Sequence, residues 1–115
     1  MAGITPIATY TLTLTSANTN YNIATLIAAI NSAERKNFAQ VVIVGYPGID
    51  GVGANTSDVL VGDASLATTR FFLALGANDQ YTFYSGDGSN GVCTPSLFVR
   101  SAGAGQKINV LLRSS

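Results

Sequence analysis

The sequence predicts a mainly β protein, either an antiparallel β-sandwich or a jelly-roll-like barrel, with one short α-helix in its N-terminal half. Short runs of β-branched and aromatic residues recur along the chain, turn residues separate these runs, and only one segment has helical spacing. A chain of 115 residues matches one ordinary domain and buries enough surface to fold without a metal or a disulfide. We therefore expect a single sandwich domain at residues 8–115, preceded by an extended N-terminal arm at residues 1–7.

The arm and the first strand differ in pattern. Residues 1–7 show no periodicity, and Pro6 disfavours a helix while it permits an extended chain. Residues 8–15 alternate strictly, with threonines on one face and larger apolar residues on the other, which predicts a half-buried strand. The apolar face of this strand contains Tyr10, Leu12 and Leu14.

One helix is predicted from about Asn22 to Arg35, over residues 22–35. Polar residues at 16–20 end the first strand, and four aliphatic residues then recur at helical spacing, namely Ile23, Leu26, Ile27 and Ile30. We expect this apolar stripe to pack on the core. The cations Arg35 and Lys36 suit the negative end of the helix dipole.

The chain after the helix is predicted to be β structure. Residues 38–44 form a run that is apolar apart from Gln40, which is typical of a strand buried on both faces. Residues 47–57 are rich in Gly and Pro and lack periodicity, which predicts a mobile surface loop. Further short strands, separated by turns, are expected at 59–61, 71–75, 81–84, 97–99 and 108–112.

The composition favours a protein that packs against other subunits. Charged residues make up 10% of the chain, and six Lys plus Arg balance six Asp plus Glu, so no basic surface is available for nucleic acid. No apolar stretch is long enough to span a membrane, and no targeting segment is recognisable. Because so little charge leaves an apolar and hydroxyl-rich surface, we expect a soluble homo-oligomer, for example a trimer.

The residue types argue against an enzyme. The chain contains no histidine, which removes Ser-His-Asp and Cys-His catalysis and the commonest metal ligand. Cys93 is the single cysteine, and a lone cysteine without histidine is more often a small buried apolar residue than a nucleophile. Asp63, Asp79 and Asp87 fall in predicted turns, where aspartate commonly bonds backbone N–H groups. No catalytic residue is therefore predicted.

Two motifs suggest ligands but fit turns better. Gly86, Gly88 and Gly91 match the G-x-G-x-x-G spacing, yet no helix follows them to hold a pyrophosphate. Three residues with side-chain oxygen donors lie in or directly after the 47–57 loop, namely Asp50, Asn55 and Asp58. Their spacing does not match an EF-hand, so a solvated loop is favoured over a calcium site. We therefore expect no cofactor and no metal.

The segment from about residue 39 to 113 resembles small phage virion proteins. The landmarks are the core strand at 41–44, the Val-Gly-Asp turn after Val59-Leu60, the Leu-Ala-Leu-Gly segment at 73–76, and the closing run Leu97-Phe98-Val99-Arg100-Ser101-Ala102. This resemblance implies a compact β-sandwich of the capsid decoration or cement type, without catalytic residues.

The resemblance and the composition together imply a structural virion protein. We expect a capsid cement (decoration) protein of a bacteriophage that is made in the host cytoplasm. We expect it to bind the major capsid protein on the outer capsid surface and to stabilise that lattice. The candidate subunit contacts lie in the arm and in the 47–57 loop region, where core periodicity is absent, and are Ile4, Pro6, Tyr46, Pro47, Ile49 and Val52.

An alternative function is a receptor-binding or carbohydrate-binding module of a phage tail or head fibre. Tyr81, Phe83 and Tyr84 could form a sugar-stacking platform, although alternation along this strand favours core packing. Solvent exposure separates the two functions. If Tyr46, Tyr81 or Tyr84 faces solvent beside Asn or Asp, recognition is favoured, and if all three are buried, cementing is favoured.

Overall fold

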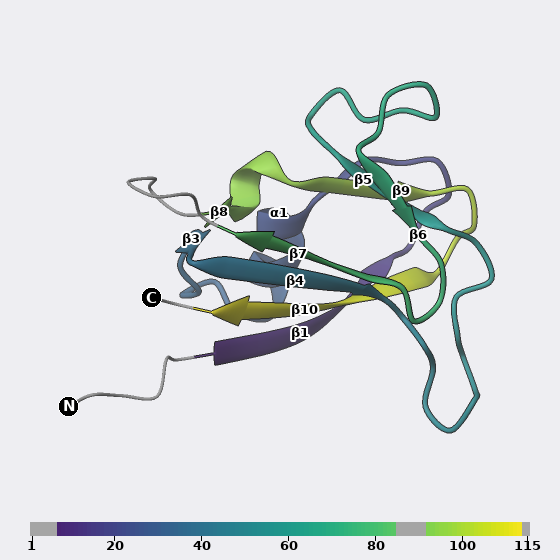
Figure 1. The fold of residues 1–115 in the computed structure, drawn as a ribbon, viewed down its shortest axis with the longest axis horizontal. Coiled ribbons are helices and arrows are strands. Elements are labelled where there is room, and N and C mark those ends of the chain that lie inside the picture. Colours follow the sequence, from purple (N-terminus) through teal and green to yellow (C-terminus); the bar gives the residue numbers. More distant parts are fainter. Residues whose placement is uncertain (1–6, 85–91, 114–115) are drawn as a thin grey trace.

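The computed structural model describes residues 7–84 and 92–113, which form a β-sandwich with one α-helix (Figure 1). Two four-stranded antiparallel sheets make up the sandwich: sheet A has the order β1-β10-β4-β7, and sheet B the order β2-β9-β5-β6. The elements are β1 (Ile7–Leu14), β2 (Tyr21–Asn22), α1 (Ile23–Ile30), β3 (Asn37–Phe38), β4 (Gln40–Gly45), β5 (Val59–Gly62), β6 (Leu73–Leu75), β7 (Gln80–Tyr84), β8 (Val92–Cys93), η1 (Thr94–Ser96), β9 (Phe98–Ser101) and β10 (Gln106–Arg113). The predicted mainly β fold with a helix in the N-terminal half is confirmed.

The strand order is that of a jelly roll. The short strands β3 and β8 pair only with each other, and the other strands of the described residues can be renumbered one to eight along the chain. Sheet A then reads 1-8-3-6 and sheet B reads 2-7-4-5, which is the jelly-roll arrangement of two Greek keys. Every connection except β5–β6 crosses between the sheets, so the chain itself ties the two layers together.

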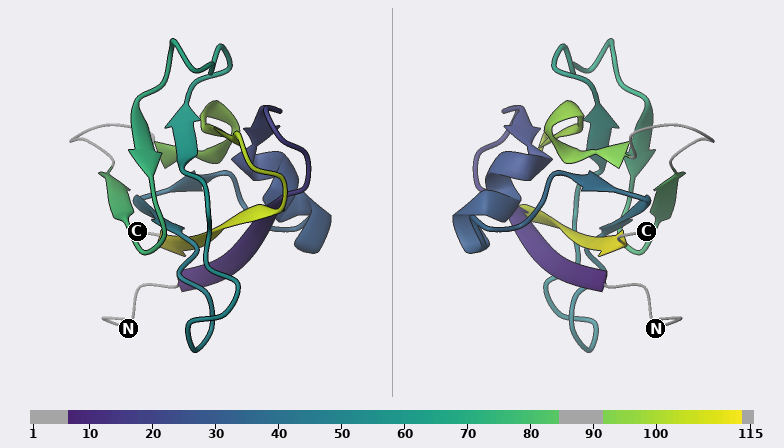
Figure 2. Two further views of the ribbon diagram at one scale, coloured as in Figure 1. Left: turned by 90° about the vertical axis from the view of Figure 1, so that its right-hand side faces the viewer. Right: turned by 90° about the vertical axis from the view of Figure 1, so that its left-hand side faces the viewer.

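The core lies between the two sheets, because alternate residues of each strand point inward. Helix α1 lies beside β1 at one side of the sandwich (Figure 2), and its buried residues Ile23 and Ile27 join the core. The core side chains are Leu12, Leu14, Ile23, Ile27, Phe38, Val41, Ile43, Val59, Val61, Leu75, Val99, Ile108, Val110 and Leu112.

Helix α1 covers residues 23–30 and is shorter than the predicted 22–35. Asn22 caps its first turn through a side-chain hydrogen bond of 3.2 Å. Asn31 ends the helix in an extended conformation, and its side chain donates to Tyr10 and accepts from a nearby backbone N–H. The prediction was too long because these competing partners are not visible in helical periodicity. No helix in the described residues is long and apolar enough to cross a membrane.

The apolar run at residues 38–44 is not one strand buried on both faces, as the sequence predicted. Its first residue pairs with β8, and the rest alternates in β4. Val41 and Ile43 are buried, whereas Val42 and Val44 are half-buried on the outer face of sheet A. That outer face carries no second layer of described residues (Figure 2), which is why half of this apolar strand remains open.

The other predicted strands are confirmed to within two residues at each end, and the run at 71–75 is shortened at its start. There β6 begins only at Leu73, and Phe71 and Phe72 are exposed. The N–H of Phe72 donates to the carbonyl of Val61 at 2.8 Å, so this segment joins β5 before the strand proper begins. Ile7, assigned by the sequence to the arm, is the first residue of β1.

Gly45, at the end of β4, packs closely against the turn between β6 and β7. Its N–H donates to the carbonyl of Asp79 at 2.8 Å, and the N–H of Asn78 donates to the carbonyl of Gly45 at 2.8 Å. A β-carbon at Gly45 would overlap the carbonyl oxygen of Gly76. Glycine is therefore required here by the close approach of two backbone segments.

Candidate functional site

The loop after β4 ends in a small hairpin that exposes two aliphatic side chains. Ile49 and Val52 exchange two backbone hydrogen bonds, of 2.9 and 3.0 Å, around a turn in which Asp50 and Gly51 have positive φ angles of 52° and 78°. Two positive φ angles are typical of a tight type I′ hairpin turn. Ile49 is 69% exposed and Val52 is 75% exposed, and we call this pair and its turn the hairpin tip.

The base of this loop is held by polar contacts with β10. The side-chain oxygen of Asn55 accepts from the N–H of Lys107 at 2.8 Å, and its amide donates to the carbonyl of Lys107 at 2.7 Å. The buried side-chain oxygen of Gln106 accepts from the N–H groups of Thr56 and Ser57, at 2.7 and 3.0 Å. The N–H of Tyr46, at the start of the loop, also donates to the carbonyl of Lys107 at 3.2 Å, so both limbs of the loop are held on β10. The expectation of a mobile loop missed these contacts because their partners lie about fifty residues away.

The predicted contact residues are divided between the base and the tip. Tyr46 is half-buried, with the Nζ of Lys107 lying 5.1 Å from its ring centroid, and Pro47 is half-buried beside it. Only Ile49 and Val52 are strongly exposed. The other predicted contacts, Ile4 and Pro6, lie outside the described residues, as do the 86–91 glycine motif, Asp87 and the side chain of Cys93.

Asn55, one of the three donors considered for calcium, has another role. Asn55 uses both atoms of its amide on the backbone of Lys107. Within residues 7–84 and 92–113, no group of three acidic or sulfur ligands gathers as a metal site.

A second surface is the outer face of sheet A. Its cross-strand rows contain threonine, valine, leucine, asparagine and glutamine, and they form a shallow hollow of about 490 Å³. Lys107 and Arg113, at opposite ends of β10, are the only charged residues on this face within the described strands. The residues between them are Thr9, Thr11, Val42, Val44, Gln80, Thr82, Asn109 and Leu111.

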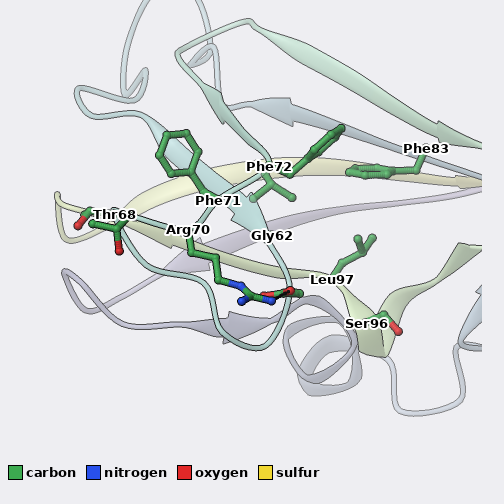
Figure 3. Close-up of a pocket in the computed structure, with 11 residues that line it drawn as sticks. Gly62, Thr68, Arg70, Phe71, Phe72, Phe83, Ser96 and Leu97 are labelled. Atoms are coloured by element: carbon green, nitrogen blue, oxygen red, sulfur yellow. Dashed lines mark hydrogen bonds and ion pairs between the residues drawn. The ribbon is translucent and has the colours of Figure 1, made fainter.

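A third surface is an open groove of about 510 Å³ between β7 and the segments around β5 and η1 (Figure 3). The ring of Phe72 packs edge-on against Tyr81 at 5.4 Å between centroids and lies 6.0 Å from Phe83. Phe72 is 61% exposed and Tyr81 is 40% exposed, so these rings meet solvent as well as each other. We call this surface the aromatic groove. Phe72 and Phe83 line it together with Val61 and Leu97, and Tyr81 borders it through its contact with Phe72.

An exposed ion pair borders the aromatic groove. Arg70 donates from Nη2 to the carboxylate of Asp63 at 2.9 Å, and the N–H of Ser65 donates to the same carboxylate at 2.9 Å. The guanidinium, and then the backbone bond, hold the pKa of Asp63 below its ordinary value. This pair offers hydrogen-bonding groups to a ligand without adding net charge to the groove.

The sequence did not identify this groove. It assigned Phe71 and Phe72 to a strand and favoured core packing for Tyr81 and Tyr84. Core packing is wrong for both tyrosines, since Tyr81 is 40% exposed and Tyr84 is 71% exposed. A signal was present: three successive apolar residues at 71–73 cannot all point to one buried face of a strand. Only Phe83 packs against the core as expected.

The exposure criterion that separated the two functions is met in one part. Tyr81 and Tyr84 face solvent, which favours recognition, but their aromatic and cross-strand partners are not Asn or Asp. Tyr81 contacts Phe72 and Phe83, and Tyr84 lies opposite Gln40 across the sheet.

Comparison of the chain with family models, with curated proteins and with solved structures found no match. Its function must therefore follow from the hairpin tip, the outer face of sheet A, the aromatic groove and the sequence.

Proposed function

We propose that this protein is a capsid decoration (cement) protein of a bacteriophage, which binds the major capsid lattice from outside and stabilises it as a homo-oligomer. The observation that carries the proposal is the hairpin tip, where Ile49 and Val52 are exposed on a braced base. An apolar contact that is already ordered before binding loses little conformational entropy when a partner covers it.

The outer face of sheet A supports the same role. A flat surface of threonine, valine and amide side chains packs against protein without the cost of stripping water from charges. The half-buried Val42 and Val44 gain most from such a cover. Low charge throughout the chain is consistent with a protein whose surface is largely shared with neighbours.

The virion setting depends on the sequence and is supported by the fold class. The resemblance at residues 39–113 points to decoration proteins, and the jelly-roll strand order is common among viral capsid and lectin domains. A fold alone does not assign a function, so the fold adds weight to both candidate functions.

Weak contacts are sufficient for cementing. Burying an aliphatic side chain contributes about 1.5–3 kcal/mol, and two such residues at the tip give a modest contact by themselves. When several copies are joined in one oligomer, their contacts with a repeating lattice act together and raise the apparent affinity by orders of magnitude. An oligomer therefore binds a capsid firmly although each tip binds weakly.

The test is rebinding to capsids of the encoding phage from which this protein has been removed. The variant Ile49→Asp/Val52→Asp should lose at least about tenfold in affinity, because each carboxylate would be buried in place of an apolar group. Thr19→Asp, in the exposed turn between β1 and β2, is the matched control and should bind normally. Normal binding by the hairpin-tip variant would contradict the proposal, as would failure of the unmodified protein to rebind or to raise the thermal resistance of the particle.

A second candidate function is glycan recognition by a fibre module, and the exposed rings of the aromatic groove favour it. Phe72 and Tyr81 offer apolar surfaces to a sugar, and Asp63 with Arg70 offers hydrogen bonds to hydroxyl groups. Aromatic NMR shifts recorded during titration with oligosaccharides test this function. Saturable shifts that Phe72→Ala abolishes and Tyr46→Phe preserves would favour recognition over cementing.

A further inference from the structure

Within the described residues, the edge strands of sheet A, β1 and β7, each pair with one neighbour only, and neither sequence has the features that usually protect an edge strand. Monomeric proteins shield edges with charges, proline, bulges or very short strands. β1 reads IATYTLTL and β7 reads QYTFY, without a charged residue or a proline, and both pair with their neighbours in unbroken register. Sheet B, in contrast, ends in β2 and β6, which have only two and three residues. Of the two four-stranded sheets in the described residues, sheet A therefore presents the longer edges to another strand.

The backbone groups at these edges follow from the hydrogen bonds of β4. The N–H of Gly45 points toward β7 and donates to the carbonyl of Asp79, and the N–H of Tyr46 points toward β10 and donates to the carbonyl of Lys107. Because successive residues of an antiparallel strand bond to opposite sides, the pattern extends across the whole sheet. It leaves the N–H and C=O groups of Gln80, Thr82 and Tyr84 facing outward from β7. On β1 the outward groups are those of Ile7, Thr9, Thr11 and Thr13.

The two edges are complementary in direction and in facing. β1 and β4 run one way, and β10 and β7 run the other way (Figure 1), so β7 of one copy lies antiparallel to β1 of a second copy in the same orientation. The residues with outward-facing backbone groups at both edges have their side chains on the outer face of sheet A. Pairing the edges therefore keeps the outer faces continuous and the inner faces continuous.

We infer that sheet A continues from copy to copy, with β7 of one subunit hydrogen-bonded to β1 of the next. This head-to-tail contact closes into a ring when the rotation between copies divides a full turn. The pairing of β7 with β1 is the contact that would hold together the homo-oligomer of the proposed function. It rests on that proposal only for the statement that the assembly decorates capsids.

The side chains at the junction are suited to pairing. If the cross-strand rows continue without stagger, Thr82 lies opposite Thr9 of the next copy, and Tyr81 lies opposite Tyr10. Threonine pairs and aromatic pairs across strands are both stabilising. The second pair would also cover Tyr81, which is 40% exposed in the single chain although its neighbour in the row, Ile43, is buried.

Molar mass in solution is the first test, by light scattering after size exclusion. The unmodified protein should have a molar mass of two or more chains of 11.9 kDa each. Thr82→Pro should have the mass of one chain, because proline removes an N–H that faces outward and breaks no bond within the sheet. Thr9→Lys should act in the same way through charge, and Thr68→Lys, in an exposed loop, should leave the mass unchanged. A single-chain mass for the unmodified protein would overturn the inference.

A disulfide between copies tests the register and does not depend on folding of the proline variant. In a Cys93→Ser background, Thr82→Cys protein is mixed with Thr9→Cys protein under mild oxidation. Residues in a hydrogen-bonded antiparallel pair have Cα atoms about 5.5 Å apart, which a disulfide spans. The mixed dimer should form at least about tenfold faster than with Thr68→Cys as the partner, because pairing raises the effective concentration of the thiols. Equal rates for the two partners would overturn the pairing.

The two proposals fail in different ways. Single-chain protein that still binds stripped capsids would refute the edge pairing and leave the decoration role intact. A crosslinkable oligomer that binds no capsid would refute the decoration role and leave the edge pairing intact.

Discussion

Tyr10 and Glu34 are joined by a hydrogen bond of 2.6 Å, in which the phenol of β1 donates to the carboxylate of the segment that follows α1. Asn31, the residue that ends the helix, donates to the same phenol oxygen at 3.1 Å. Tyr10 thus fixes where the helix stops and where the chain turns toward β3. One side chain of the first strand thereby sets the path of a segment more than twenty residues later.

Replacing Tyr10 by Phe removes both hydrogen bonds and keeps the ring. We expect the free energy of unfolding to fall by about 0.5–1.5 kcal/mol, the usual net value of a partly exposed hydrogen bond. Denaturant unfolding measures this change. Tyr46→Phe, which also removes one hydroxyl group from a half-buried ring, is the control, and an equal loss in both variants would show that the hydrogen bonds contribute nothing specific.

The same contact makes stability depend on alkaline pH. The bond to Glu34, which needs the neutral phenol, raises the pKa of Tyr10 above its ordinary value of 10.0. A raised pKa in the folded state gives a contribution that is complete below pH 10 and is lost as the pH rises through the folded value. We expect ultraviolet titration to show one tyrosine that ionises late, and Glu34→Gln should bring its ionisation back toward pH 10.

The exposed pair Asp63 and Arg70 should affect titration more than stability. Arg70 lowers the pKa of Asp63 below its ordinary value of 3.8. The stability that this pair contributes is therefore present above pH 3.8 and is lost as the pH falls below that value. We expect Arg70→Gln to return the pKa of Asp63 to its ordinary range in an NMR titration. The melting temperature at neutral pH should stay the same, because solvent screens a surface ion pair. A large loss of stability would contradict this assignment.

Helix α1 provides a matched pair of substitutions. Ile27 is buried against the core, and Ile30, one turn later, is exposed. We expect Ile27→Ala to lower the free energy of unfolding by about 2–5 kcal/mol and Ile30→Ala to change it by less than about 0.5 kcal/mol. Equal effects in chemical denaturation would mean that the helix packs through a different face.

The close approach at Gly45 predicts strong intolerance to any side chain. Gly45→Ala forces a β-carbon onto the carbonyl of Gly76, and we expect a loss of about 3 kcal/mol or more, or failure to fold. Gly51→Asn is the control, because Gly51 has open space around it and asparagine tolerates its positive φ. Thermal unfolding of both variants checks the contrast.

The sequence predicted elements whose signals are local and missed features that depend on distant partners. The alternation of Leu12 and Leu14 with threonine was sufficient to identify β1, and the spacing of Ile23 and Ile27 was sufficient to identify the helix. The end of the helix was missed because Tyr10, which holds Asn31 and Glu34, lies on another element.

The candidate surfaces were predictable to a similar degree. Ile49 and Val52 were predicted as contacts because they lie in a loop without core periodicity, and the structure shows that both side chains are exposed. The braced base was not visible, since Gln106 and Asn55 are ordinary polar residues until the fold brings them together. The aromatic groove was missed because burial was inferred from hydropathy, whereas the position of Phe72 ahead of β6 leaves it in solvent.

The pairing of Ile7 with Arg113 places the start of β1 beside the end of β10. A peptide joined to either strand at this end would leave the molecule at nearly the same point, away from the loops that follow β4 and β5 (Figure 1). A short linker could likewise connect the two strands, with new termini opened near Thr68 in the β5–β6 loop, to give a circular permutant. The domain is thus suited to carrying cargo at one end while the other end remains free to engage a surface.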